Sequence, residues 1–267
     1  GIDDGKGFFM KIMRLHRWLL DEYKRDGSFA WGKTIVGYST LVLAIIIISG
    51  LVIWYPRNRK ALKNRFKIRT KAGWFRFLYD LHVSGGFYAA LLLLILALTG
   101  LTWSFGWYRD AFYTAFGIST TSKQTHAPTS AVPQKTAGER GSKKHPKTDY
   151  TQWSEVLADL QSRYPEYKSI SIQDGSATVS TAAYGNTRGS DRYSFDPATG
   201  KITEIQLYKD LPKSAKIRGW IYSVHAGTWG GLTTRILSCL VSLLGAVFAI
   251  TGYYFWIKKK LRKSKQR

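Results

Sequence analysis

Residues 80–105 read DLHVSGGFYAALLLLILALTGLTWSF, with no charged side chain from His82 to Phe105. A helix of this length reaches about 30 Å, at about 1.5 Å per residue, which is the thickness of one bilayer core. The stretch therefore predicts a membrane-spanning helix. Its imidazole, His82, falls in the first turn, and an ionisable residue at membrane depth indicates a functional site by default. The alternative is a histidine that hydrogen-bonds another helix or lies in the wet interface.

Two acid-free basic blocks, residues 57–76 and 258–267, account for much of the net charge of +23. Both blocks border apolar runs, so the positive-inside rule makes them cytoplasmic, where they also attract anionic lipid headgroups. The N-terminus and the region between the second and third spans are then outside. A nucleic-acid partner is not expected, because that function needs basic residues gathered on a folded soluble face.

Two further spans are expected, over residues 33–55, where Pro56 ends the helix, and over residues 226–256. Before them, residues 8–23 carry apolar side chains at steps of three and four, which predicts an amphipathic helix. His16 lies on its apolar stripe. The alternative for this segment is an interfacial helix that happens to carry a histidine.

The rest of the chain predicts a linker and a small domain. Residues 119–148 are rich in Ser, Thr, Pro, Gly and Lys, and their histidines, His126 and His145, are expected to be solvated. Residues 149–212 combine helical spacing with short runs of alternating polarity, which favours one helix laid on an antiparallel meander. The expected strands are residues 169–172, 177–182, 192–195 and 201–207.

The fold class is therefore an α-helical membrane protein with three spanning helices, an N-terminal amphipathic helix and a small α+β extracytoplasmic domain. We divide it into five parts. These are an amphipathic helix and entry segment (1–32), two spanning helices with a basic loop (33–118), a flexible linker (119–148), the small domain (149–212), and a third span with a basic tail (213–267).

The single cysteine, Cys239, excludes an intrachain disulfide, and no CxxCH motif is present for covalent haem attachment. The chain begins with glycine, which favours a fragment or a processed chain.

Each expected span ends its apolar run with a small hydroxyl residue, a glycine and then an aromatic residue. The pairs are Ser49-Gly50, Thr99-Gly100 and Thr251-Gly252. The topology puts Gly100 at the outer depth with His16 and His225, and the other two glycines at the inner depth with His82. Glycines that allow close approach are thus expected to face histidines at both depths, although ordinary small-residue helix packing would give the same pattern.

His16 and His225 share the outer level, and His82 lies at the inner level roughly 30 Å away. Histidines that far apart cannot share one iron, whose two axial nitrogens are only about 4 Å apart. The chain therefore offers one complete outer pair and one inner histidine without a partner. Trans-membrane redox proteins arrange two haems in this way, one near each surface.

Several blocks together resemble the PepSY-associated transmembrane proteins. They are LHRWLL (15–20), ISGLVIWYPR (48–57), LHVSGG with TGLTW (81–103), YSFDPATGKI (193–202) and VHAGTWGG with AITGYYFWIKKK (224–260). This family of bacterial inner-membrane proteins includes haem-containing, siderophore-linked iron reductases. The resemblance implies that His16, His82 and His225 are axial ligands of b-type haems, and that the small domain is a PepSY module with a binding or regulatory role. Family members usually begin with one more helix and another PepSY domain, so the resemblance implies two haems, the inner one taking its second ligand from an upstream fragment or subunit.

The predicted function is transfer of electrons across the inner membrane by a b-type haem protein, to reduce periplasmic ferric iron or a ferric siderophore. A quinol or a cytoplasmic reductase is the expected donor. The alternative is a non-enzymatic, membrane-anchored PepSY module that binds or restrains a partner. We expect Arg14 or Arg17, and Arg218 or Arg235, to pair with the outer haem's propionates, although contact with lipid headgroups would also use these cations.

Overall fold

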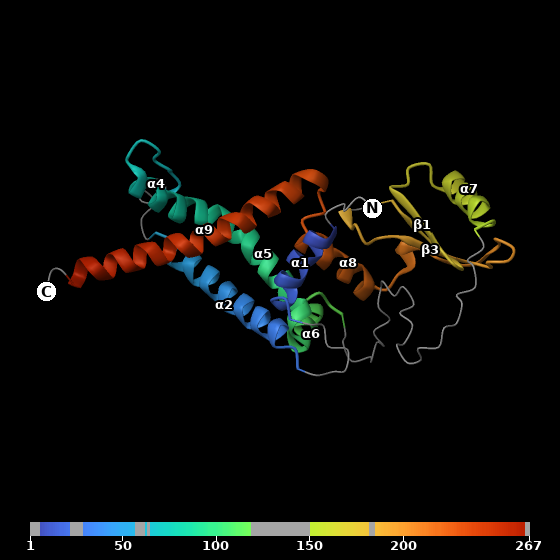
Figure 1. Ribbon diagram of the computed structural model, residues 1–267, viewed down its shortest axis with the longest axis horizontal. Coiled ribbons are helices and arrows are strands. Elements are labelled where there is room, and N and C mark those ends of the chain that lie inside the picture. The colour runs from blue at the N-terminus through green and yellow to red at the C-terminus, as the bar shows by residue number, and fades with distance from the viewer. Residues whose placement is uncertain are drawn as a thin grey trace. The chain divides into compact units, whose positions relative to one another are not determined.

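The structure is a computed structural model that describes residues 6–21, 29–56, 62, 65–118, 150–181 and 185–264. The predicted linker with His126 and His145, and parts of both basic blocks, lie outside these residues. The chain forms two compact units (Figure 1). The membrane unit is Gly1–Arg109 with Val224–Arg267, and the soluble unit is Asp110–Ser223.

Within the described residues, three helical segments are long and apolar enough to cross a membrane: Trp31–Trp54, Trp74–Ser104 and Gly231–Arg262. The predicted fold class is confirmed. The first segment is α2 (Trp31–Trp54), and the third is most of α9 (Gly231–Ser264). The middle segment joins α4 (Trp74–Asp80), η1 (Leu81–Gly85) and α5 (Gly86–Ser104), and α5 packs against both α2 and α9. Large apolar side chains along α2 and α9 stay exposed, as lipid-facing side chains do.

The middle segment contains one π-helical turn, η1, at the start of its apolar run. The amide of Gly86 donates to the carbonyls of both Leu81 and His82 as this turn ends. A π-turn holds an extra residue and so rotates the side chains that come before it relative to those that follow. This rotation sets the direction in which His82 points, whereas the sequence predicted a regular helix here.

The third span begins at Gly231, five residues later than predicted, because residues 226–230 form a turn. Gly227 and Gly231 adopt φ values of +64° and +71°, a conformation that favours glycine. His225 therefore ends a separate helix, α8 (Lys213–His225), instead of opening the third span.

The N-terminal helix α1 (Lys6–Trp18) is shorter than the predicted helix over residues 8–23. Leu19 and Leu20 leave the helix with φ values of 52° and 66°, so they are not part of its stripe. A side-chain carbon at Gly32 would overlap the Trp18 carbonyl, and the Gly32 amide donates to the Asp21 carboxylate at 3.1 Å. The C-terminal end of α1, with His16, is thereby held against the start of α2.

The soluble unit lays α7 (Trp153–Arg163) on a four-stranded antiparallel sheet of order β1-β2-β3-β4. The strands are β1 (Ser169–Gln173), β2 (Ser176–Ser180), β3 (Asp191–Phe195) and β4 (Ile202–Gln206). The predicted helix on a meander is confirmed. Its core is made of Val156, Leu160, Ala177, Val179, Tyr193 and Phe195. Two helices that the sequence did not predict, α6 (Gly106–Ala115) and α8, run across the two ends of this unit in the chain, and η3 (Tyr208–Asp210) precedes α8.

Candidate functional site

His16, in the last turn of α1, and His225, at the end of α8, come together in the membrane unit. Their ring centroids are 6.0 Å apart and their planes are inclined by 39°. We call this arrangement the pair site. The two residues are 209 positions apart in the sequence, so the fold, and not local structure, brings them together.

The Nδ1 atom of His225 is anchored to α5. It lies 2.9 Å from the Leu96 carbonyl oxygen and 3.1 Å from the Thr99 hydroxyl oxygen. A carbonyl oxygen only accepts, so these partners require a proton on Nδ1. The other ring nitrogen, Nε2, then carries the lone pair, which is the form in which an imidazole binds a metal.

Gly100 lets the His225 ring approach α5 closely. A Cβ at this position would lie 3.0 Å from His225 Cε1, tighter than almost any real contact. The Trp103 ring covers the imidazole from the same helix, with centroids 5.1 Å apart in an edge-to-face arrangement. The predicted closeness of Gly100 to an outer histidine is therefore confirmed as a contact.

Burial lowers the pKa of His225, and the neighbouring His16 shifts that pKa in the same direction. The hydrogen bond to the Leu96 carbonyl opposes the shift, but burial is the largest cause. Both effects that lower the pKa favour the neutral imidazole. His16 is exposed, whereas His225 is half-buried.

His82 is held by the same kind of threonine–glycine contact, made by a different helix. Its Nδ1 atom lies 2.7 Å from the Thr251 hydroxyl oxygen of α9, and a Cβ at Gly252 would lie 3.4 Å from His82 Cε1. The edges of Phe248 and Phe255 flank the ring, each with its centroid 5.8 Å away. We call this arrangement the His82 site.

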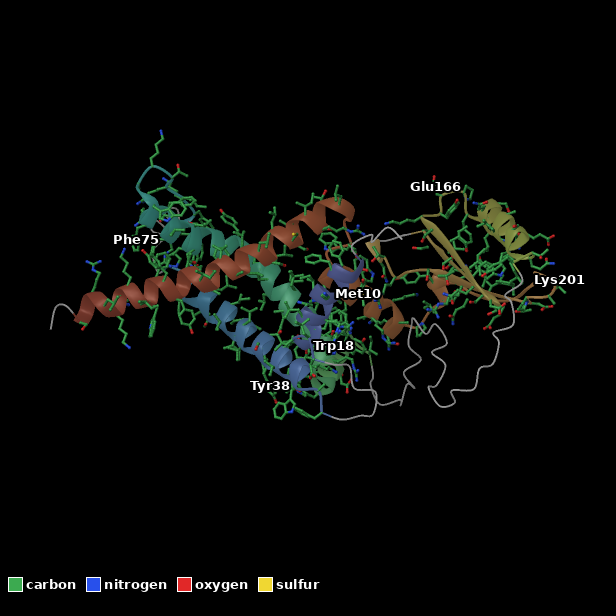
Figure 2. The ribbon with its side chains drawn as sticks, in the orientation of Figure 1. Met10, Trp18, Tyr38, Phe75, Glu166 and Lys201 are labelled. Carbon is green, nitrogen blue, oxygen red and sulfur yellow. The ribbon has the colours of Figure 1, made fainter. Side chains whose placement is uncertain are left out.

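The two sites lie far apart along one continuous helix. His82 belongs to the Thr251-Gly252 contact, and Thr99, 17 residues further along the chain, belongs to the pair site. At about 1.5 Å per residue, 17 residues of helix span about 25 Å. Figure 2 labels Phe75 of α4 and Trp18 of α1, which lie towards opposite ends of the membrane unit. One metal ion cannot bridge both sites.

The other glycines that the sequence singled out differ in what lies next to them. Nothing lies within 4 Å of a Cβ built on Gly50, so the prediction that Gly50 faces a histidine is wrong for the described residues. Gly86 also faces open space, whereas a Cβ on Gly85 would meet Leu81 at 3.2 Å.

Arg14 and Arg17, two of the four arginines expected at the haem propionates, have other contacts in the structure. Arg14 donates to the Leu20 carbonyl at 3.3 Å, and the Arg17 guanidinium lies 4.4 Å from the centre of the Trp18 ring. Arg235 is exposed on α9. Arg218 belongs to the soluble unit. Pairing of these cations with a propionate stays a prediction.

Each site borders a cavity. One, of about 240 Å³, is lined by His16, by Leu19, and by α2 side chains that include Ile35, Val36 and Leu43. The other, of about 320 Å³, is lined by Gly252, Tyr253 and Trp256. The surroundings of both are largely apolar, which suits a flat hydrophobic cofactor better than a hydrated ion.

The pair site fits a haem iron. A single iron held by two opposed imidazoles places their centroids about 6 Å apart, since each Fe–N bond is about 2 Å and each nitrogen lies about 1 Å from its ring centre. The observed 6.0 Å agrees with this value. In the part of the chain that the structure describes, no group of three or more His, Cys, Asp or Glu side chains gathers as a metal site. A two-histidine pair suits a metal whose other four ligands come from a porphyrin.

These features define a polytopic helical membrane protein that carries a small α+β domain and cross-helix histidine contacts. The profile of the family described as the PepSY-associated TM region matches residues 2–259. The chain belongs to this PepSY-associated transmembrane family, as its sequence blocks predicted. No curated protein matches it.

Proposed function

We propose that this chain is a b-type haem membrane protein that carries electrons across the bacterial inner membrane to a ferric acceptor on the periplasmic side. The observation that carries the proposal is the pair site, where two imidazoles from α1 and α8 stand 6.0 Å apart with one Nδ1 anchored. In this proposal the small domain is periplasmic, and the basic loop and tail are cytoplasmic.

His16 and His225 would hold the haem at the pair site. When bound, the haem supplies one-electron chemistry between Fe(III) and Fe(II), with a potential that the protein tunes through its ligands and surroundings. The Leu96 carbonyl and the Thr99 hydroxyl orient His225, and Gly100 leaves its ring room against α5. Leu19 and α2 side chains that include Ile35, Val36 and Leu43 line the cavity beside His16.

The acceptor in this proposal is ferric iron held by oxygen ligands, either as a simple chelate or as a siderophore complex. A quinol, or a cytoplasmic reductase, supplies the electrons. One quinol oxidised to the quinone reduces two ferric ions and releases two protons, so electrons and charge balance. Fe(II) binds hard oxygen ligands less tightly than Fe(III), which releases the iron.

The His82 site supports a second haem at the opposite depth. His82 is anchored as His225 is, and Gly252, which faces its ring, also lines a cavity with Tyr253 and Trp256. His16 and His225 are about 25 Å of helix away from it. His82 would hold this second haem, with Thr251 keeping its Nδ1 atom in place.

The test is the absorbance spectrum of the purified full chain, before and after reduction by dithionite. We expect the sharp reduced bands of a bis-histidine b-type haem, and their loss when a ferric chelate with oxygen ligands is added without air. A protein that carries no haem after expression with sufficient haem supply would contradict the proposal. If the reduced bands persist after the ferric chelate is added, the protein binds haem but does not reduce the chelate, and the reductase function is contradicted.

A second candidate, a non-enzymatic PepSY module that binds a partner, rests on the soluble unit. This unit has its own core, and the sheet face opposite that core is rich in hydroxyl groups. Ser169, Ser171, Thr178 and Ser194 lie on this face. A spectrum without haem bands would favour this candidate.

A further inference from the structure

Two Thr-Gly pairs hold two histidines in the same way. In α5, Thr99-Gly100 receives His225, and in α9, Thr251-Gly252 receives His82. In both contacts the threonine oxygen meets the Nδ1 atom, and the glycine next to it faces Cε1 of the same ring. The device therefore recurs between different helices.

The threonine protons are already committed to their own helices. The Thr99 hydroxyl donates to the Ile95 carbonyl at 2.7 Å, and the Thr251 hydroxyl donates to the Val247 carbonyl at 2.8 Å. A hydroxyl has one proton, so each threonine presents only oxygen lone pairs to its histidine. Each histidine must then donate from Nδ1, which leaves Nε2 unprotonated.

We propose that Thr99 and Thr251 are positioning residues that fix the Nδ1-protonated tautomer of His225 and His82 and so present Nε2 to the haem iron. The inference rests on the proposed function and assigns to each iron ligand the group that orients it. Such partners of a ligating histidine fix its tautomer and raise its basicity. The glycine that follows each threonine brings the ring within reach of the hydroxyl.

Loss of the threonine hydroxyl should disturb His82 more than it disturbs His225. The His225 Nδ1 atom also has the Leu96 carbonyl at 2.9 Å, so it keeps an acceptor when the Thr99 hydroxyl is removed. For His82, Thr251 is the hydrogen-bond partner that the described residues provide to Nδ1. Removing the hydroxyl of Thr251 therefore has the larger effect.

The effect has a defined sign. A hydrogen bond from Nδ1 raises the electron density on Nε2, and a more basic ligand stabilises Fe(III) more than Fe(II). Loss of the acceptor weakens the ligand and raises the midpoint potential. Each tenfold weakening of Fe(III) binding relative to Fe(II) binding raises a one-electron potential by about 59 mV.

The experiment compares Val and Ser at each position in the purified full chain, with wild type beside them. Valine replaces the hydroxyl by a methyl group, whereas serine keeps the hydroxyl and removes the methyl. The readouts are the midpoint potentials of each haem and the rate at which haem passes to an excess of a haem-scavenging apoprotein. Far-ultraviolet circular dichroism controls for folding.

We expect Thr251→Val to weaken haem retention at the His82 site about 10- to 100-fold and to raise that haem's midpoint potential. Thr251→Ser should stay near wild type, and Thr99→Val should change the pair-site haem less than Thr251→Val changes the other. If Thr251→Val is not recovered folded, Thr251→Ala against Thr251→Ser makes the same comparison, since these variants differ only in the oxygen.

If wild type carries haem and both the Val and Ser variants keep its midpoint potentials and haem retention, this inference is overturned and the proposed function stands. Equal losses in Val and Ser would overturn it as well, since serine keeps the hydroxyl and should stay near wild type. A wild type without haem would overturn both.

Discussion

The pair site and the His82 site use one anchoring device with different surroundings. In both, a threonine oxygen holds Nδ1 and a glycine faces the ring. The pair site adds a second imidazole, His16, and a carbonyl acceptor, whereas the His82 ring lies between the edges of Phe248 and Phe255. The helix contacts therefore anchor both histidines, while a separate element, α1, completes only the pair site.

The largest expected effect is the loss of haem when either imidazole of the pair site is removed. His16→Ala and His225→Ala should each remove the same haem, because the proposed function makes both side chains ligands of one iron. The double variant should lose no more haem than either single variant. Haem per chain and the reduced spectrum measure this. A double variant that loses twice as much would show that His16 and His225 serve different irons.

The two glycines give the next largest contrast. In Gly100→Ala the new Cβ would lie 3.0 Å from His225 Cε1, so the ring must move, and overpacking of this kind costs about 1–3 kcal/mol. In Gly252→Ala the distance to His82 Cε1 is 3.4 Å, an ordinary contact, and alanine favours the helix by about 1 kcal/mol. Haem retention should therefore fall in the first variant and hardly change in the second. The reverse order would contradict the contact geometry.

A smaller effect is expected at the arginines. If Arg17 and Arg218 pair with propionates of the pair-site haem, Arg17→Ala and Arg218→Ala should each shift its potential and leave the His82-site haem unchanged. Potentiometric titration of each variant measures this. Unchanged affinity and potential in both variants would assign these cations to lipid headgroups instead.

The smallest effect on either site is expected from a change in the soluble unit. The Tyr164 hydroxyl donates to the Asp191 carboxylate at 2.6 Å and lies 2.6 Å from the Tyr193 hydroxyl. Burial raises the pKa of Tyr164, and its hydrogen bond to Asp191 adds to the shift. Tyr164→Phe should destabilise this unit by about 1–2 kcal/mol and leave both haem spectra unchanged.

The pH dependence of this variant has a definite sign. Because the folded-state pKa of Tyr164 is raised, its neutral hydroxyl stabilises the fold fully below the ordinary pKa of about 10, and the stabilisation is lost as the pH rises above it. Thermal unfolding of the full chain should show the difference between wild type and Tyr164→Phe narrowing above pH 10. If the difference in stability between wild type and Tyr164→Phe stays constant above pH 10, Tyr164 is not the source of the pH dependence.

Much of the architecture could be predicted from the sequence because apolar length and alternation report it directly. The three spans, the four strands and the helix over Trp153–Arg163 follow from residues in one continuous segment each. The end of α1 could not be predicted, because Leu19 and Leu20 continue the apolar stripe while their backbone turns. The helix α8 was missed because its polar residues hide any periodic stripe.

The grouping of His16 with His225 was predictable from the sequence, whereas the contacts that hold the histidines were not. Depth alone grouped His16 with His225 and matched the glycines to histidines by level. It could not show that the Thr99 hydroxyl and the Leu96 carbonyl both reach one nitrogen, nor that Gly50 faces no histidine in the described chain. These facts depend on how each helix is rotated about its own axis, which a uniform apolar run does not encode.

The measurement that tests the central claim most directly is the number of haems per chain in His82→Ala against wild type. The claim is that the two histidine sites are separate, about 25 Å apart along one helix. We predict that the variant loses one haem of two, and that the remaining haem keeps the spectrum and potential of the pair site. An unchanged haem count, or loss of both haems together from a folded variant, would contradict the account.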